Sequence, residues 1–309
     1  MFAINDLRVQ YQLRGKIVHA VDRVSFSLEN NESLGIVGES ACGKSTLGLA
    51  IIRSVMGGKI ISGEILLDGQ DILKMSDEEF TKNIRWKKIA MVFQGAMNSL
   101  DPVFSIKQQF EEILRTHDYS GNRLEMINEA IASVGLPSSV LNKFPHELSG
   151  GMKQRAVIAM ALLLKPELVI ADEPTTALDV LVQAQVLSLL KKLKKEGMSL
   201  VLISHDLGII SEIADKVAIM YAGKIVEFGT LQEVYSNPKH PYTKSLLESV
   251  PKIKGKSDLM SLKGNPPDLA NPPEGCRFYD RCSQAMEKCR KDPQKTKTKS
   301  GYVSCWLYE

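Results

Sequence analysis

The stretch that decides the fold is Ser33–Thr46, which reads "SLGIVGESACGKST". It begins with an apolar run without alternation, which is typical of a strand covered on both faces. It then matches the pattern G-x-x-x-x-G-K-[ST] from Gly38 to Ser45. Glycines let backbone N–H groups turn toward phosphate oxygens, and a helix N-terminus favours anions. The stretch therefore predicts a strand, a phosphate-binding loop and a helix, with Lys44 reaching the β- and γ-phosphates and the Ser45 hydroxyl binding Mg²⁺.

Composition places the chain among folded, soluble proteins. Its 309 residues are 44% hydrophobic and 24% charged, with a net charge of +3, which is too small to argue for nucleic-acid binding. The longest apolar run, Ala156–Leu164, is shorter than the roughly 18 residues of a membrane span. The first residues include Asp6 where a signal peptide would be basic and then apolar. We therefore expect a cytosolic protein of one large domain or two modest ones.

The rest of the chain predicts a mixed α/β fold with a mostly parallel sheet. Buried strands are expected at Lys88–Gln94, Leu168–Glu173 and Ser199–His205, with helical patterns between them. Alternating segments at 7–12, 21–29 and 63–72 predict an antiparallel flap. We predict one α/β domain over 1–250 with a helical subdomain at about 97–160, followed by a loop-rich module over 251–309.

Two carboxylates follow a predicted strand. Asp172 and Glu173 end the apolar run "LVIADE", and ligands bind at the carboxyl ends of strands in open α/β sheets. Asp172 could hold Mg²⁺ through water, and Glu173 could polarise an attacking water. Alone, such a run is more often a strand leading to solvent. Beside a phosphate loop, the catalytic interpretation is favoured.

A second glycine-rich helix start occurs in "LSGGMKQR", Leu148–Arg155. A helix N-terminus with Ser149 at its cap can bind an anion. The alternative is a plain glycine-rich turn with an N-cap serine. A single nucleotide rarely needs two such helix starts from one subunit.

Together these motifs closely resemble those of the ATP-binding cassette (ABC) proteins. Gln94, "ALD" at 177–179 and His205 occur in the family's order and spacing. The resemblance implies that two cassettes pair head to tail, so that Ser149 and Gly151 of one subunit contact the γ-phosphate held by the other.

The resemblance also implies roles for single residues. His205 corresponds to a switch histidine that hydrogen-bonds the γ-phosphate, Asp179 to the loop joining the two sites, and Gln94 to a sensor of Mg²⁺ and the nucleophilic water. Tyr11 is at the position of an aromatic that stacks on adenine, although it could equally pack within its strand. The residues expected to contact ATP are Tyr11, Gly38, Glu39, Ser40, Ala41, Cys42, Gly43, Lys44, Ser45, Thr46, Ser149, Gly150, Gly151 and Asp179.

The phosphate loop departs from the family at one place. Members commonly have a third glycine where this chain has Ala41, followed by Cys42. Ala keeps the turn only if its φ is below zero, so we expect a negative φ and a working loop. Cys42 is interpreted as a small loop filler.

Three further segments resemble the oligopeptide/dipeptide importer subfamily. They are 91–106, 237–251 with its "HPYT", and 264–282. This resemblance implies a peripheral ATPase at the cytoplasmic face of the membrane that powers import of peptides, oligosaccharides or nickel. It implies two permease subunits, a second similar ATPase or a second copy of this chain, and an extracytoplasmic substrate-binding protein, with no nucleic acid. The alternative is a soluble ABC ATPase acting on ribosomes or DNA.

Four of the five cysteines are in the last 34 positions: Cys276, Cys282, Cys289 and Cys305. Cytosolic thiols stay reduced, which disfavours disulfides, and structural zinc sites favour closer C-x₂₋₄-C pairs. Iron–sulfur clusters take four thiolates at varied spacings. The spacing also resembles that of importer ATPases, some of which carry a [4Fe–4S] cluster. That cluster is therefore the preferred prediction over zinc, disulfides or free thiols.

Four basic residues lie near these cysteines. They could offset the charge of a cluster or form a solvated basic loop, and they are Arg277, Arg281, Lys288 and Arg290.

Overall fold

A computed structural model describes residues 1–95, 98–176, 178–249 and 264–309. The chain forms two compact units, the first from Met1–Lys74 with Leu202–Glu309 and the second from Met75–Val201. Strand β8 (Ser199–Ser204) is where the chain passes from the second unit to the first. The predicted boundary at 250/251 and the predicted start of the helical subdomain at 97 lie outside the described residues.

The first unit contains an antiparallel sheet with strand order β2-β1-β4-β5. Its strands are β1 (Phe2–Leu13), β2 (Lys16–Leu28), β4 (Gly58–Leu67) and β5 (Gln70–Asp71). Apolar side chains such as Ile4, Leu7 and Val24 are fully buried, while their neighbours along the strands face solvent. The alternation in the sequence thus predicted this flap correctly.

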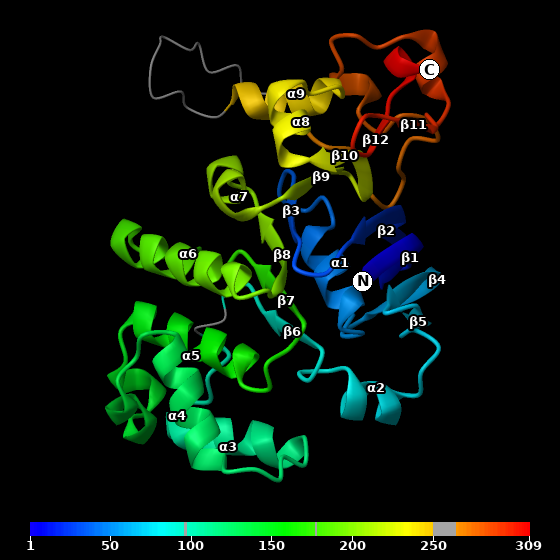
Figure 1. The fold of residues 1–309 in the computed structure, drawn as a ribbon. Helices are drawn as coiled ribbons and strands as arrows, with labels where there is room; N and C mark the ends of the chain where they lie inside the picture. The colour runs from blue at the N-terminus through cyan, green and yellow to red at the C-terminus, as the bar shows by residue number, and fades with distance from the viewer. Residues whose placement is uncertain (96–97, 177, 250–263) are drawn as a thin grey trace. The chain divides into compact units, whose positions relative to one another are not determined.

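The second sheet of this unit combines distant parts of the chain, in the order β11-β12-β10-β9-β3. Its strands are β3 (Ser33–Val37), β9 (Lys216–Tyr221), β10 (Lys224–Thr230), β11 (Lys295–Lys297) and β12 (Tyr302–Ser304). The β3–β9 pair is parallel and the other pairs are antiparallel. The chain's last strands therefore extend this sheet, and Figure 1 shows the red C-terminal segment beside β10.

Four helices of the first unit are α1 (Lys44–Ile51), α7 (Leu207–Ile213), α8 (Leu231–Ser236) and α9 (Pro241–Glu248). Residues 264–309, here called the cysteine module, contain the 3₁₀ turns η4 (Tyr279–Arg281), η5 (Glu287–Arg290) and η6 (Trp306–Tyr308). Short turns rather than long helices therefore position the four C-terminal cysteines.

The second unit is largely helical. Its α-helices are α2 (Asp77–Asn83), α3 (Ile106–Thr116), α4 (Arg123–Ser133), α5 (Gly150–Leu162) and α6 (Val180–Lys195). The 3₁₀ helices η2 (Ser138–Asn142) and η3 (Pro145–Glu147) connect α4 to α5. Capping boxes at Ser76 and Ser105 satisfy backbone N–H groups at the starts of α2 and α3.

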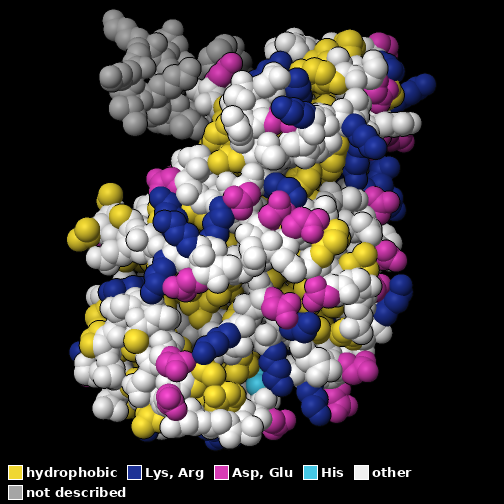
Figure 2. Space-filling model, in the orientation of Figure 1, with side chains coloured by type: hydrophobic (Ala, Val, Ile, Leu, Met, Phe, Trp, Pro, Cys, Tyr) yellow, Lys and Arg dark blue, Asp and Glu magenta, His cyan; other side chains and the backbone are white. Residues whose placement is uncertain are grey.

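Strands β6 (Ile89–Val92) and β7 (Leu168–Asp172) pair in parallel in the second unit, and every residue of both is buried. Continuous apolar runs are therefore parallel strands covered on both faces, as expected. Among the described residues, no helix has the length and apolarity needed to cross a bilayer. Figure 2 shows acidic and basic side chains intermingled over the visible face, in keeping with the small net charge.

Candidate functional site

The phosphate loop runs between β3 and α1, where two glycines have no room for a side chain. A Cβ added to Gly38 would lie 2.0 Å from the Met220 carbonyl oxygen. Gly43 has φ 104°, and a Cβ there would lie 2.1 Å from the Ala20 carbonyl oxygen. Strands β2 and β9 therefore approach the loop so closely that glycine is required at both ends of the motif.

Lys44 folds back over this loop. Its side chain is buried, and Nζ donates hydrogen bonds to the carbonyl oxygens of Gly38 at 2.7 Å and Glu39 at 2.9 Å. The ammonium also lies 3.7 Å from the Cys42 sulfur. Burial raises the pKa of the Cys42 thiol above its usual value. Cys42 is thus a buried, neutral filler of the loop, as its small size suggested.

The expected negative φ of Ala41 is wrong. Ala41 has φ 61°, in the left-handed region. That region brings Cβ close to the following carbonyl oxygen and costs about 1–2 kcal/mol for a residue other than glycine. The loop keeps the left-handed turn that the family's usual glycine would adopt without this cost, because the packing of Gly38 and Gly43 fixes its two ends.

Tyr11 lies beside the start of α1. Its hydroxyl is 3.4 Å from the Thr46 Oγ1, and its ring fills the space next to Gly58 on β4. The ring is half-buried. Tyr11 therefore stands next to the phosphate loop, with part of its surface open to solvent.

In the second unit, the side chains of Gln94 and Thr176 both contact that of Glu173 just beyond the ends of β6 and β7. Gln94 Nε2 and Thr176 Oγ1 each donate a hydrogen bond to Glu173 Oε2, both at 2.9 Å. Glu173 has φ 46°, an uncommon conformation that also recurs at functional sites in other proteins. Asp172 directly before it is 2% exposed. The carboxylate of Glu173 is thus held in one orientation by two donors.

Thr176 is a residue of this group that the sequence reasoning missed. The signal was its spacing, since a hydroxyl three residues after a carboxylate can turn back to it across a tight turn. Gln154 was missed as well. It is buried on α5 and donates to the Pro174 carbonyl oxygen at 2.8 Å, which connects α5 to the segment after Glu173.

The segment Leu148–Arg155, the second glycine-rich helix start, contains the beginning of α5. Ser149 is its N-cap, and its hydroxyl oxygen accepts a hydrogen bond from the Met152 N–H at 3.3 Å. A Cβ on Gly151 would lie 2.6 Å from Val182 Cγ1 on α6. Asp179 caps α6 by accepting from the Val182 N–H at 2.9 Å. The starts of these two helices are therefore packed against each other, while Gly150 faces solvent.

His205 belongs to the first unit and is exposed directly after β8. Ala177, the first residue of "ALD", lies outside the described residues. Ser40 is exposed, and Ser45 and Thr46 are half-buried at the start of α1. The hydroxyl groups of Ser40, Ser45 and Thr46 are oxygen ligands, the type that Mg²⁺ prefers.

The five cysteines, all within the described part of the chain, are free thiols. Four of them line one small cavity of about 10 Å³ with His240 and Phe278: Cys276, Cys282, Cys289 and Cys305. Burial, together with repulsion between neighbouring thiolates, raises the pKa of Cys276 to about 12. Burial lowers the pKa of His240 to about 3.

Convergence of four thiols is the donor set that an iron–sulfur cluster requires, but the cavity has room for about one water. Among the described residues, no group of three or more His, Cys, Asp or Glu side chains is arranged to hold a metal ion. The four thiols thus match a cluster in number and line one cavity, but their arrangement in this structure does not hold one.

The solvated-loop interpretation is wrong for two of the four basic residues of the module. The side chains of Arg277 and Arg281 are only 5% and 6% exposed and pair with acidic residues elsewhere in the first unit. Lys288 and Arg290 are exposed, at 54% and 64%. Only this second pair lies on a solvated surface.

Comparison with known proteins agrees with this geometry. A family model described as "ABC transporter" matches residues 21–176, and one described as "Oligopeptide/dipeptide transporter, C-terminal region" matches residues 226–289. The chain belongs to the ABC transporter family of ATP-binding proteins. It is accordingly an ATP-hydrolysing enzyme, and the resemblance seen in the sequence is confirmed.

Similar proteins cover nearly the whole chain. The dipeptide transport ATP-binding protein DppD of Caldanaerobacter subterraneus subsp. tengcongensis is 42% identical, over 99% of this chain and 96% of its own. The oligopeptide transport ATP-binding protein OppD of Bacillus subtilis is 42% identical, over 99% of this chain and 88% of its own. AppF of the same organism, an oligopeptide transport ATP-binding protein, is 46% identical over 94% and 90%.

A solved structure is similar in fold. The ATP-binding cassette MJ0796, solved as a dimer in a post-hydrolysis state with ADP and Pi, is 28% identical with a TM-score of 0.66. The match covers 75% of this chain and 99% of that one. The predicted fold class, a P-loop cassette of mixed α/β structure, is therefore confirmed.

Proposed function

We propose that this chain hydrolyses ATP to drive import of oligopeptides or dipeptides through a membrane permease. The observation that carries the proposal is the presence in one chain of the cassette motifs and of the region 226–289, which matches the C-terminal region of oligopeptide/dipeptide transporters. The names of the DppD, OppD and AppF relatives support a peptide substrate.

Within the ATP site, Lys44 and the backbone N–H groups of the phosphate loop bind the β- and γ-phosphates. Glu173 acts as the general base for the attacking water. Its carboxylate is ready for this role because Gln94 and Thr176 orient it through hydrogen bonds of 2.9 Å. Tyr11 stacks on adenine, since its half-buried ring lies next to Thr46.

Mg²⁺ neutralises charge that develops on the phosphates when it is bound. Ser45, Gln94 and Asp172 would hold it, because they offer a hydroxyl, an amide oxygen and a buried carboxylate, all of them oxygen donors. His205 donates a hydrogen bond to the γ-phosphate from its exposed position after β8.

Two cassettes complete the site head to tail. Ser149, Gly150 and Gly151 at the start of α5 face the γ-phosphate of the partner cassette, and Asp179 joins the two sites. The helix start suits this role because it presents backbone N–H groups to an anion. The dimeric MJ0796 cassette supports pairing, and the partner is a second similar ATPase or another copy of this chain.

The working complex contains two permease subunits and an extracytoplasmic substrate-binding protein, with the ATPase peripheral at the cytoplasmic face. The four C-terminal cysteines would hold a [4Fe–4S] cluster, with zinc as the alternative, if their side chains moved apart to admit it. Free thiols that line one cavity support cysteine ligation. The division into an ATPase domain over 1–250 and a module over 251–309 is kept as part of this proposal.

Two measurements test this function. Deletion of the gene should abolish uptake of labelled peptides, and a plasmid carrying the wild-type chain, but not the Glu173→Gln variant, should restore it. The affinity-tagged chain should purify from detergent extracts with permease subunits. Recovery of the tagged chain in ribosome or DNA fractions, with peptide uptake intact in the deletion strain, would favour the soluble ATPase instead.

A further inference from the structure

An ion pair between Arg281 and Glu39 connects the cysteine module directly to the phosphate loop. Nη1 of Arg281 donates to Glu39 Oε2 at 2.8 Å, and Nη2 donates to Oε1 at 2.9 Å. Nη1 also donates to the Tyr221 hydroxyl at 3.1 Å. A two-pronged guanidinium–carboxylate pair fixes orientation as well as distance. Since the Arg281 side chain is only 6% exposed, solvent screens the pair less than an ordinary surface salt bridge.

Glu39 is the second residue of the phosphate loop, and its backbone is held on both sides. Its N–H donates to the Tyr242 hydroxyl at 2.9 Å, and its carbonyl oxygen accepts from Lys44 Nζ at 2.9 Å. Arg281 thus fixes the residue that orients the phosphate-binding ammonium. A shift of Glu39 would move the carbonyl oxygen that accepts a hydrogen bond from Lys44 Nζ.

A second connection leads through the turn between β9 and β10. Arg277 donates to the Ala222 carbonyl oxygen and, at 2.7 Å, to Asp22 Oδ2. The N–H of Gly223, the next residue in that turn, donates to the Cys42 carbonyl oxygen of the phosphate loop at 2.8 Å. The module therefore supports the loop at Glu39 directly and at Cys42 through one intervening turn.

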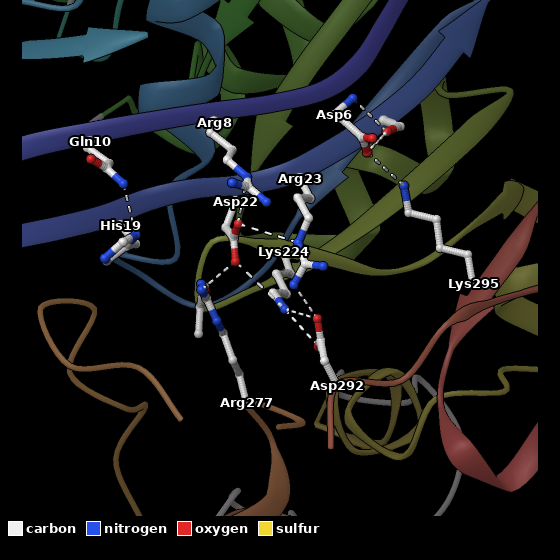
Figure 3. Close-up of polar contacts among 12 residues, drawn as sticks. Asp6, Arg8, Gln10, His19, Asp22, Arg23, Lys224, Arg277, Asp292 and Lys295 are labelled. Atoms are coloured by element: carbon white, nitrogen blue, oxygen red, sulfur yellow. Dashed lines mark hydrogen bonds and ion pairs between the residues drawn. The ribbon is translucent and has the colours of Figure 1, made fainter. Parts of the chain in front are cut away.

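Charged side chains join the module to the strands near this turn. Figure 3 shows Asp22 between Arg8, Arg277 and Lys224, and Asp292 of the module facing Arg23 and Lys224. Lys224 Nζ lies 2.7 Å from Asp292 Oδ1. The network anchors the module to β2 and β10.

Adhesion alone does not require Arg281. Tyr221, Tyr242 and Phe278 already form a buried aromatic cluster between the module and the rest of the first unit, with ring centroids 4.6–5.4 Å apart. A buried ion pair generally adds little stability over apolar residues of similar size. What it adds is a fixed orientation of the groups it joins. Here the group being oriented belongs to the phosphate loop.

We propose that Arg281 is a positioning residue for ATP binding, so that the cysteine module acts as part of the wall of the nucleotide site. Arg281 sets the position of Glu39, and Glu39 sets that of the Lys44 ammonium. The proposal concerns ATP binding and does not depend on which substrate is transported. Both arginines directly follow or precede a cysteine, Cys276–Arg277 and Arg281–Cys282, so the arrangement of the thiols bears on the same loop.

The test compares Arg281→Gln with Arg290→Gln in the full-length chain. Arg290 lies in the same module next to Cys289, but it contacts the exposed Glu287 and the Tyr279 ring, neither of them in the phosphate loop. Arg281→Gln should raise the KM for ATP about tenfold, a loss of about 1.4 kcal/mol in binding, with kcat at saturating ATP nearly unchanged. Arg290→Gln should leave both constants at the wild-type values. An unchanged KM for a folded Arg281→Gln protein would overturn the proposal.

A double-mutant cycle separates positioning from general destabilisation. Glu39→Gln should raise the KM as Arg281→Gln does, and the double variant should be no worse than either single one, because both remove the same interaction. Independent, additive effects would contradict the proposal. Arg281→Lys keeps the charge without the fork and should fold even if Arg281→Gln does not. It should raise the KM about threefold, and a wild-type KM in this variant would equally refute the role.

Discussion

Ala41 in the phosphate loop gives the clearest prediction, because its substitution by glycine should remove backbone strain without removing a side-chain contact beyond Cβ. The residue is exposed and has φ 61°. The left-handed conformation costs an alanine about 1–2 kcal/mol relative to glycine. Glycine also raises the conformational entropy of the unfolded chain, which offsets about 0.4–1 kcal/mol of this gain in stability. Ala41→Gly should therefore stabilise the nucleotide-free protein by about 0.5–1 kcal/mol.

Equilibrium urea unfolding at fixed pH measures this difference, with a rise in Tm of about 1–3 °C as a second readout. Ala132→Gly is the matched control, since Ala132 is exposed near the end of helix α4, where glycine costs up to about 1 kcal/mol. The change from alanine to glycine should thus raise the free energy of unfolding at position 41 and lower it at position 132. A loss of stability in Ala41→Gly, similar to that of Ala132→Gly, would show that the loop does not hold position 41 in the left-handed region.

Three other changes test the site. Glu173→Gln should lower kcat for ATP hydrolysis about 10²–10⁴-fold while ATP still binds, and a variant as fast as wild type would remove Glu173 from the base role. Gly43→Ala should cost roughly 2–3 kcal/mol because its Cβ would meet the Ala20 carbonyl oxygen at 2.1 Å. Gly15→Ala, with φ 77° but open space, should cost less in the same denaturation assay, and equal losses would contradict the steric argument. Anaerobically purified wild-type chain should contain iron that Cys282→Ser loses, whereas colourless wild-type protein without iron would exclude the cluster.

The sequence predicted well those features that depend on neighbouring residues. The motif from Gly38 to Ser45 specifies strand, loop and helix because its glycines, lysine and hydroxyl act within one turn of backbone. The apolar runs before Asp172 and at β3 identified buried strands, because a strand covered on both faces needs no alternation.

What the sequence could not predict depends on contacts between distant residues. Arg281 and Glu39 are 242 positions apart, and no periodicity links them. The left-handed φ of Ala41 follows from the close approach of β2 and β9 to Gly43 and Gly38, which local propensity does not contain. For the same reason the sequence left two interpretations open for the basic residues around the cysteines, an offset to a cluster's charge or a solvated loop. Their acidic partners, such as Asp22, lie near the other end of the chain.

The pairing of β12 with β10 has a consequence for how this protein can be divided. Glu227 and Phe228 of β10 pair with Val303 and Tyr302, so the final residues supply hydrogen bonds to a strand of the nucleotide-binding unit. A fragment that stopped before β12 would leave β10 with exposed N–H and C=O groups, and an unpaired strand edge of this kind recruits other chains. Strand β12 of the cysteine module therefore covers an edge of β10 that would otherwise be open, which is a reason to study the ATPase as the whole chain.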